Sequence, residues 1–392
     1  MTPGTPPHGV LAETRPASRW LGLYIHVPFC VQRCHYCSFN TAPLGDEGAM
    51  ARYLATLRCE IARLAALPWA HDVGLATVFF GGGTPSLVDP DDLAGILGAL
   101  AAGFRLAPDA EVTVECNPES VSRARLEAYL ASGVNRLSLG VQSLEDALLK
   151  HLGRLHDTRA ARAAFDAARE AGCINVSVDL MYGLPGLDLS GWRRTVDTVL
   201  DWGPEHLSAY GLTLDAGSLW GAAGVDGLPP ESVVVEQYWA LARAAAARGF
   251  EHYEISNYAR PGSRSRHNQI YWRGEEYLAC GPGGAGFIGD VRYTNAKALA
   301  RYCATLEAGA LPIDGWERLS ARQRVGERLI LGLRTADGVP AAALAERLAQ
   351  DPTLHGRVAA WYEAGLLRET RERVNLSEAG FLVSDTLFVE LV

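Results

Sequence analysis

The chain has 392 residues, a formal net charge of −9 and an apolar content of 48%. This length allows one large domain or two to three smaller ones. No run approaches the about 18 consecutive apolar residues of a membrane-spanning helix. The acidic balance argues against a nucleic-acid-binding surface over the whole chain, so we expect no nucleic acid among the main partners.

The first segment, residues 1–20, reads MTPGTPPHGVLAETRPASRW and is rich in proline. It lacks the apolar stretch of a signal peptide, so we expect a disordered N-terminus and a cytoplasmic protein. In a reducing cytoplasm, clustered cysteines indicate metal or redox chemistry more often than disulfides. Peripheral membrane association and a homodimer stay compatible with the sequence.

Short apolar stretches alternate with amphipathic helical patterns over residues 21–215, and each helical pattern closes near a glycine. Strands that alternate with helices form parallel sheets through right-handed crossovers. We predict an α/β fold, an incomplete (β/α)6 barrel of the TIM type. A Rossmann fold is disfavoured because no G-x-G-x-x-G follows a strand and because polar residues gather at strand ends, where barrels build their sites. The expected strands are 21–29, 76–82, 111–116, 136–142, 175–185 and 206–213.

The composition changes after residue 215. Residues 216–300 are predicted to form an α+β extension of the barrel that carries the motif HNQIYW. Residues 301–392 are predicted to form a helical C-terminal domain, in which a helix, a charged hairpin and another helix resemble a winged helix. Its candidate helix carries Arg357 but also Glu363 and few other bases. We therefore expect a structural or partner-docking role, because phosphate contacts need concentrated Lys and Arg.

Three of the eight cysteines, Cys30, Cys34 and Cys37, stand close together in the stretch YIHVPFCVQRCHYCSFN. Thiolates are soft ligands that select zinc or iron–sulfur clusters. Structural zinc takes four ligands, usually as two pairs, and no second Cys-x-x-Cys exists, although His26 or His35 could complete a zinc site. Three thiolates suit a [4Fe–4S] cluster whose fourth iron stays open. The spacing alone favours the cluster and leaves zinc or redox thiols as alternatives.

Glycines and polar residues follow several of the expected strands. Gly82, Gly83 and Thr84 end or follow strand 76–82, where glycines let a backbone approach a ligand, or simply allow a tight turn. Glu115 lies near the end of a strand, as a solvated rim carboxylate or as a ligand contact. Charged and amide groups on barrel strands need partners, which a polar cofactor supplies. Further candidates of this kind are Gln142 at a strand end, Arg154 on the following helix and Asp179 in the fifth strand.

The cysteine motif, with Tyr36 before its last cysteine and its place after the first strand, resembles the radical S-adenosylmethionine (SAM) superfamily. The resemblance implies a [4Fe–4S] cluster whose open iron is chelated by the amine and carboxylate of SAM. It also implies reductive cleavage of SAM to a 5′-deoxyadenosyl radical. By position, the residues that the resemblance assigns to SAM are Tyr24, Tyr36, Gly82, Gly83, Thr84, Glu115, Gln142, Arg154 and Asp179.

Four motifs stand in the order typical of the coproporphyrinogen III oxidase-like branch, namely YIHVPFC, GGGTPS, RLSLGVQS and DLMYGLPG. This resemblance covers residues 21–390. The branch holds the oxygen-independent oxidase and the heme chaperone HemW family. Cys37 is followed by Ser38 and Phe39, where the oxidase continues Gly-Cys, and the N-terminal arm is short, so the chaperone family is nearer. The resemblance implies delivery of heme to an unidentified acceptor protein. Coproporphyrinogen decarboxylation and a zinc-stabilised interaction module stay open as alternatives, as does SAM cleavage.

The stretches YEISNYA (253–259) and HNQIYW (267–272) resemble signatures of the chaperone family, which binds heme. A neutral imidazole is a common ligand of heme iron. If this stretch is helical, His267 and Tyr271 share one face. Alone, such a histidine fits a turn or helix cap equally well. With the resemblance, we predict His267 as a heme ligand.

One loop departs from the family pattern. The family reads Gly-x-Gly-Ala-His-Ser, whereas this chain reads GPGGAG, with Gly284, Ala285 and Gly286 at the last three positions. An imidazole and a hydroxyl are therefore missing. If they serve heme or SAM binding in the family, this chain binds that group differently.

Overall fold

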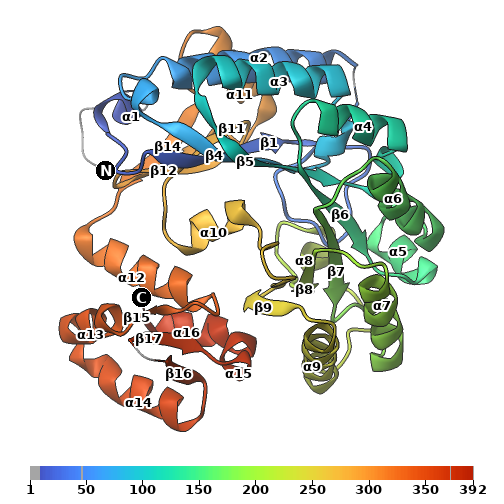
Figure 1. The fold of residues 1–392 in the computed structure, drawn as a ribbon, viewed down its shortest axis with the longest axis vertical. Helices are drawn as coiled ribbons and strands as arrows, with labels where there is room; N and C mark the ends of the chain where they lie inside the picture. Colours follow the sequence, from blue (N-terminus) through green and yellow to red (C-terminus); the bar gives the residue numbers. More distant parts are fainter. Residues whose placement is uncertain (1–8, 46, 371, 392) are drawn as a thin grey trace.

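A mixed sheet of twelve strands forms the core, and the computed structural model describes residues 9–45, 47–370 and 372–391 (Figure 1). Its six middle strands are parallel and follow the chain order, as repeated right-handed crossovers require. Apart from the first five residues of β5, they are mostly buried, which is typical of parallel strands covered by helices. The prediction of six barrel strands is confirmed. The strands are β1 (Trp20–Val27), β4 (Gly74–Gly82), β5 (Arg105–Cys116), β6 (Arg136–Gln142), β7 (Val176–Tyr182) and β8 (His206–Gly211).

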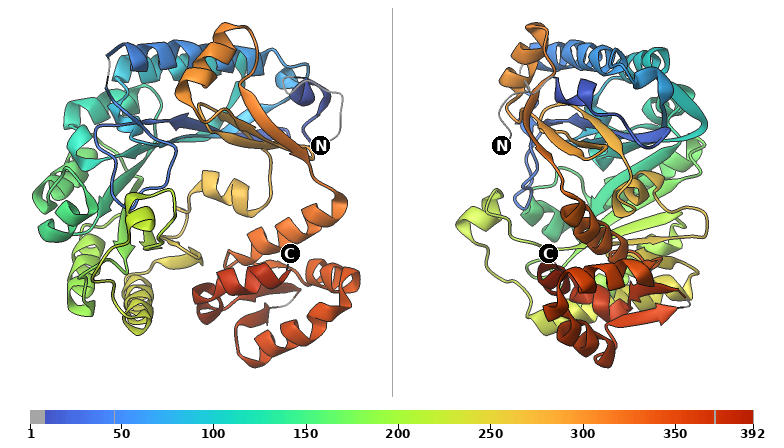
Figure 2. Two further views of the ribbon diagram at one scale, coloured as in Figure 1. Left: turned by 180° about the vertical axis from the view of Figure 1, so that it is seen from behind. Right: turned by 90° about the vertical axis from the view of Figure 1, so that its left-hand side faces the viewer.

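The helices that connect these strands cover the outer, convex face of the sheet (Figure 1, Figure 2). Four of them begin at a side chain that accepts a hydrogen bond from a backbone N–H of the first turn, namely Asp89, Ser122, Asp157 and Asp188. The connecting helices are α2 (Glu47–Ala65), α3 (Pro90–Gly103), α4 (Arg123–Ala131), α5 (Asp146–Leu152), α6 (Thr158–Glu170) and α7 (Leu189–Asp201). Two further helices follow β8, namely α8 (Leu219–Ala223) and α9 (Glu231–Ala247). Short 3-10 turns occur at Ala70–Asp72, Pro85–Leu87 and Pro118–Ser120.

The segment after β8 extends the sheet at both ends. β10 (Asn257–Ala259) and β9 (Glu251–Glu254) add to β8, and the antiparallel strands β12–β14 continue from β11, which is parallel to β1. The sheet curves without closing, so the predicted incomplete barrel is confirmed, and α10 (Arg266–Trp272) lies inside the curve (Figure 1). The remaining strands are β11 (Tyr277–Cys280), β12 (Ala285–Ile288), β13 (Val291–Asn295) and β14 (Ile313–Arg318).

The N-terminal segment has more structure than the sequence suggests. Residues 1–8 lie outside the described part, but Val10–Glu13 form the short helix α1. Val10 and Leu11 are fully buried in the barrel core, and Trp69 donates a hydrogen bond from Nε1 to the Leu11 carbonyl (2.7 Å). The expectation of a disordered N-terminus is therefore wrong for residues 9–20. Two buried apolar side chains compensate for the ordering entropy there.

The C-terminal region has a hydrophobic core of its own, built from side chains of α12 to α16. Its three-stranded sheet and helices give the predicted winged-helix-like form. The elements are α12 (Ala321–Leu333), β15 (Val339–Pro340), α13 (Ala341–Gln350), a 3-10 turn (Pro352–Leu354), α14 (His355–Glu363), β16 (Leu367–Thr370), β17 (Arg373–Leu376), α15 (Glu378–Leu382) and α16 (Ser384–Leu391).

This second core begins near α12, not at residue 301 as predicted. The helix α11 (Leu299–Glu307) packs on the barrel, and its Tyr302 donates a hydrogen bond to the buried Glu60 carboxylate of α2 (2.6 Å). β14 pairs with β13 in the main sheet. No helix of the described residues is both long and apolar enough to cross a membrane.

Candidate functional site

The three clustered cysteines lie on the loop that follows β1, at the carboxyl ends of the barrel strands. All three are half-buried and none forms a disulfide. The two-residue strands β2 (Phe29–Cys30) and β3 (Ala42–Pro43) pair with each other and fix both ends of the loop. Within it, the Cys37 N–H donates to the Cys34 carbonyl (3.2 Å). The loop is therefore closed on itself, with its thiols at the site where barrels hold ligands.

Two polar side chains from other elements approach these thiols. Arg154 points Nη1 at the Cys34 sulfur (3.7 Å), and Thr84 points its hydroxyl at the Cys30 sulfur (3.6 Å). Burial raises the pKa of the Cys30 and Cys37 thiols. Thiolate ligands need positive charge nearby, which bound iron supplies and Arg154 supplements. Three thiols that can ligate iron, with one guanidinium beside them, therefore fit an anionic iron–sulfur cluster.

The geometry gives no support to a single metal ion here. Within the described residues, no three His, Cys, Asp or Glu side chains converge on one metal position. A four-iron cluster does not need such convergence because each thiolate binds a different iron. His26, which could have completed a zinc site, is engaged at both ring nitrogens, with the Tyr24 hydroxyl (3.0 Å) and the Asn40 carbonyl (2.7 Å).

The glycines after β4 let this strand approach the cysteine loop closely. Gly82 has a φ of +112°, and Gly82 donates its N–H to the Glu115 carboxylate (3.1 Å). A Cβ added to Gly83 would lie only 2.6 Å from the Phe29 carbonyl oxygen. Only glycine fits both positions. The structure thus brings the predicted residues Gly82, Gly83 and Thr84 beside Cys30.

Two carboxylates lie deeper in the barrel, behind the cysteine loop. Burial, and to a lesser degree the Asp179 charge, raises the pKa of Glu115 to about 7. Burial also raises the pKa of Asp179, which accepts a hydrogen bond from the Ser138 hydroxyl (3.0 Å). Both line a cavity of about 160 Å³ together with Tyr24, Phe79, Arg136, Ser138, Ser208, Tyr210, His267, Asn268 and Tyr271. Such desolvated carboxylates suit a cationic ligand, and the sulfonium group of SAM is a cation.

We expect SAM binding to strengthen about tenfold between pH 6 and pH 8, because the Glu115 carboxyl ionises with a pKa of about 7 and its ionised form attracts the cation. The sign is reversed for stability. A folded-state pKa above the ordinary value means that ionisation costs stability as the pH rises from about 4.5 to about 7. Calorimetric titration with SAM checks this. The variant Glu115→Gln should bind weakly and show no such pH slope, and an equal slope in both proteins would contradict the assignment.

A strained backbone position marks the end of β6. Gln142 is the one non-glycine residue with positive φ in the described chain, at +66°. It follows a register shift in the pairing of β6 with β7, as at a β-bulge. A Cβ on Gly140 would lie 3.1 Å from Gln142 Nε2 and 3.2 Å from Arg154 Nη2, so both side chains meet over this glycine. Arg154 Nη2 also donates to the Asn117 amide oxygen (2.7 Å), while its Nε is buried without a partner in the described residues. A strained backbone, as at Gln142, and a buried donor without a partner, as at Arg154, are both typical of a ligand site.

Replacing Gln142 by glycine should raise the free energy of unfolding by about 1 kcal/mol, because glycine relieves a strain of about 1–3 kcal/mol and partly offsets this through its own chain entropy. The same change should weaken SAM binding. Gln142→Ala is the matched control, since it removes the same side chain but keeps the strain. Denaturant unfolding of both variants checks the prediction, and equal stability of the two would contradict it.

His267 lies inside the barrel and not on a surface open to heme. It is 1% exposed, and burial lowers the pKa of its imidazole to about 3. Its Nδ1 shares a hydrogen bond with the Thr77 hydroxyl and its Nε2 with the Tyr271 hydroxyl, both at 2.7 Å. Its ring stacks on Phe79 at 5.0 Å. The stretch is helical, so His267 and Tyr271 share one face of α10. His267 as a heme ligand stays a prediction, and its ring would have to exchange Thr77 or Tyr271 for iron.

The substituted loop 284–286 is filled by a neighbouring strand. A Cβ on Gly286 would collide with the ring of Tyr293, its partner on β13. The Tyr293 hydroxyl accepts a hydrogen bond from the Ala279 N–H (2.9 Å), which fixes the ring there. Ala285 is exposed. The Tyr293 ring thus occupies the space that a larger side chain at position 286 would need.

Several site residues were not singled out from the sequence. Asn117 bridges Arg154 and the Thr84 hydroxyl (3.1 Å), and Arg136 is buried beside both carboxylates. The only signal for Arg136 is a charged residue that opens an otherwise apolar strand. Asn117 carries no signal, because its role depends on three elements meeting. The predicted SAM residues Tyr24, Glu115 and Asp179 do lie together in one cavity.

Comparison with known proteins agrees with this geometry. A family model described as the Radical SAM superfamily matches residues 24–199, and one described as the HemN C-terminal domain matches residues 319–383. The heme chaperone HemW of Mycobacterium tuberculosis (strain ATCC 25618 / H37Rv) is 38% identical over 377 residues, which cover 93% of each chain. The chain belongs to the HemW family. Through this family it is a radical SAM protein, and that superfamily implies a [4Fe–4S] cluster and SAM as cofactors.

Two further relatives and one solved structure are also similar to this chain. The heme chaperone HemW of Bacillus subtilis (strain 168) is 33% identical and the match covers 93% of this chain and 97% of that protein. The mitochondrial radical S-adenosyl methionine domain-containing protein 1 of Mus musculus is 41% identical, with 86% and 77% covered. The solved structure of coproporphyrinogen III oxidase (HemN) from Escherichia coli has a TM-score of 0.85 at 22% identity, covering 97% and 92%. This last likeness confirms the fold.

Proposed function

We propose that this protein is a heme chaperone that carries heme to an acceptor protein in the cytoplasm. The observation that carries the proposal is the likeness to HemW heme chaperones over almost the whole chain, combined with an intact cysteine loop and carboxylate cavity. Cys30, Cys34 and Cys37 would hold the [4Fe–4S] cluster, which supplies an open iron for SAM. No nucleic acid is proposed as a partner, because the exposed helix of the winged-helix-like part, α14, carries Arg357 and Glu363 without a basic stripe.

The residues of this chain would divide the binding of SAM between them. Gly82 and Gly83 would leave room for its methionine end, and Glu115 and Asp179 would attract its sulfonium group. Arg154 would link the two cofactors, because it contacts both the Cys34 sulfur and the carbonyl of Gly140 (2.7 Å). Coproporphyrinogen oxidation is not proposed, since the oxidase is alike in fold alone, at 22% identity.

The test is anaerobic reconstitution with iron and sulfide, followed by titration with hemin and then by mixing with an apo-hemoprotein. We expect a saturable Soret band on titration, and we expect bound hemin to reach the acceptor faster than free hemin does. An unrelated acidic protein of similar size serves as the control for nonspecific binding. Hemin absorption equal to this control would exclude the chaperone function. Formation of protoporphyrinogen from coproporphyrinogen in the same preparation would indicate the oxidase instead.

His267→Ala should lower the free energy of unfolding by about 2–4 kcal/mol, because it empties a buried position and leaves the Thr77 and Tyr271 hydroxyls without their partner. Hemin affinity should change by no more than about threefold, which is less than 1 kcal/mol, because the His267 ring is buried and both of its nitrogens are engaged. Thermal unfolding and hemin titration of the same variant check both parts. Loss of hemin binding in a folded variant would contradict this expectation and support His267 as the heme ligand.

A further inference from the structure

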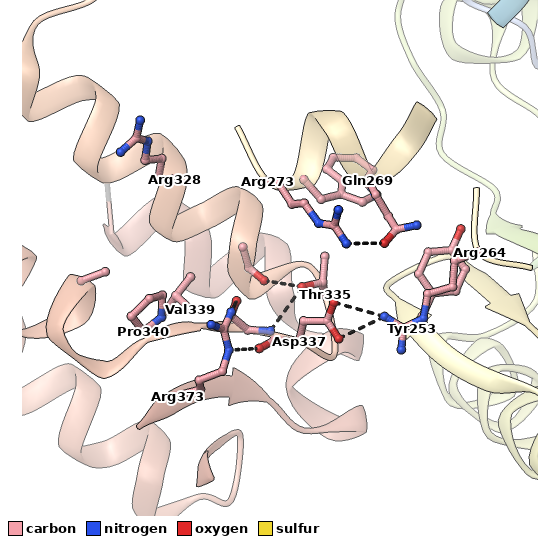
Figure 3. A pocket seen from close by; sticks show the side chains of 14 residues that line it. Tyr253, Arg264, Gln269, Arg273, Arg328, Thr335, Asp337, Val339, Pro340 and Arg373 are labelled. Atoms are coloured by element: carbon pink, nitrogen blue, oxygen red, sulfur yellow. Dashed lines mark hydrogen bonds and ion pairs between the residues drawn. The ribbon is translucent and has the colours of Figure 1, made fainter. Parts of the chain in front are cut away.

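A second and larger cavity lies between α10 and the C-terminal domain, on the side of α10 that faces away from the barrel cavity (Figure 3). Its volume is about 340 Å³, within the range of about 300–1,000 Å³ in which pockets hold organic ligands. Gln269 and Trp272 of the HNQIYW motif line it from one side, and Val339, Pro340 and Arg373 line it from the other. The motif helix therefore serves two cavities, one through His267 and Tyr271 and the other through Gln269 and Trp272.

The cavity is positively charged in a protein that is acidic as a whole. Four arginines and one aspartate line it. Arg264 is paired with Asp337 (3.0 Å), and Arg373 donates to the backbone carbonyls of Asp337 and Gly338 (both 2.7 Å). Arg273 and Arg328 are different: both are exposed and neither forms an ion pair with a carboxylate of the described residues. Arg273 donates one hydrogen bond from Nη2 to the Gln269 side-chain oxygen (2.8 Å), and the other N–H groups of the two guanidiniums are available to an anion.

Aromatic and aliphatic side chains form much of the remaining wall. Tyr253, Trp272, Val339 and Pro340 line the cavity. The Arg334 guanidinium lies 4.6 Å from the centre of the Trp272 ring and fixes that ring. The indole Nε1 of Trp272 is buried without a hydrogen-bond partner in the described residues, which is an unexplained donor at the cavity wall. Aromatic and aliphatic walls beside two arginines match a planar, mainly apolar molecule with carboxylates at one edge.

None of the lining residues is a histidine, cysteine or methionine, the usual ligands of heme iron besides tyrosine. The Tyr253 hydroxyl is engaged with His206 Nε2 (2.8 Å) and with the Ser265 N–H (3.3 Å). We propose that this cavity binds the porphyrin of heme through its propionates at Arg273 and Arg328 and through its ring plane, and leaves the iron without a protein ligand. This inference rests on the proposed heme chaperone function. A carrier that does not ligate the iron leaves it open to the axial ligand of an acceptor.

The test compares hemin, metal-free protoporphyrin IX and hemin dimethyl ester in absorbance titrations of the full-length, cluster-loaded protein. Arg273→Ala/Arg328→Ala is the variant, and Arg322→Ala is the matched control, because Arg322 is an exposed arginine of α12 outside the cavity. The wild type should bind hemin and protoporphyrin IX within about threefold of each other, and the ester at least tenfold more weakly. The double variant should bind hemin and protoporphyrin IX about tenfold more weakly than the wild type does, and it should bind the ester with unchanged affinity. Thermal unfolding confirms that it is folded.

The outcomes separate this inference from the proposed function. Hemin binding by the wild type that is unchanged in the double variant would overturn the cavity assignment and leave the chaperone function standing. Hemin binding without protoporphyrin IX binding would also overturn it, because it would show that the iron is ligated. No saturable hemin binding by the wild type would overturn the chaperone function itself.

Discussion

Cys34→Ala is expected to abolish the iron–sulfur cluster, lowering iron from about four atoms per chain to near zero. Cys34 is one of three thiols on a loop whose ends are fixed by the pairing of β2 with β3, and no described side chain stands ready to replace it. Its sulfur is also the one that Arg154 approaches. Because a structural metal group adds its binding energy to folding, the variant should in addition unfold more easily than the loaded wild type.

Iron and acid-labile sulfide analysis after anaerobic reconstitution measures this effect. Cys59→Ala is the control, because Cys59 is exposed on α2, outside the cysteine loop, and should keep the full cluster. Full iron content in Cys34→Ala would show that this thiol is not a ligand. One zinc per chain in place of iron and sulfide would show that the loop is a zinc site after all.

Gly83→Ala should cost about 3 kcal/mol of unfolding free energy and sharply reduce cluster loading and SAM binding. A Cβ at this position would lie 2.6 Å from the Phe29 carbonyl oxygen and 2.7 Å from that of Pro28, both backbone atoms just before Cys30. Backbone atoms cannot rotate away as a side chain does, so the cysteine loop must shift. Two backbone hydrogen bonds between the strand end and the loop would be strained with it, one from the Gly83 N–H and one from that of Thr84.

The matched control is Gly98→Ala in α3. A Cβ there meets no atom within 4 Å, and alanine in a helix stabilises by about 0.5–1 kcal/mol over glycine. Denaturant unfolding should therefore show a lower free energy of unfolding for Gly83→Ala and a slightly higher one for Gly98→Ala. Iron analysis should show reduced cluster loading in Gly83→Ala and full loading in Gly98→Ala. Normal cluster loading in Gly83→Ala would mean that the loop adapts to the added methyl group.

The amino-acid sequence by itself determined the features that depend on local spacing. The alternation of apolar strands and amphipathic helices predicted the six barrel strands, because periods of 2 and 3.6 residues are properties of a short window. The three clustered cysteines, the glycines after β4 and the acidic residues at strand ends also lie in short stretches that parallel strands bring to one edge. The shared face of His267 and Tyr271 follows from their spacing of four residues once the segment is helical, as it is in α10.

Only the tertiary structure decided which distant groups meet. The Thr77 partner of His267 is 190 residues away in the chain, and this contact holds the imidazole inside the barrel. The ordering of Val10 and Leu11, the sheet extension beyond β1 and β8, and the meeting of Arg154 with Asn117 are of the same kind. The cavity between α10 and the C-terminal domain joins segments 253–273 and 328–373. Such contacts depend on strand register and on how helices pack, which are set by the whole core and not by any short stretch of the chain.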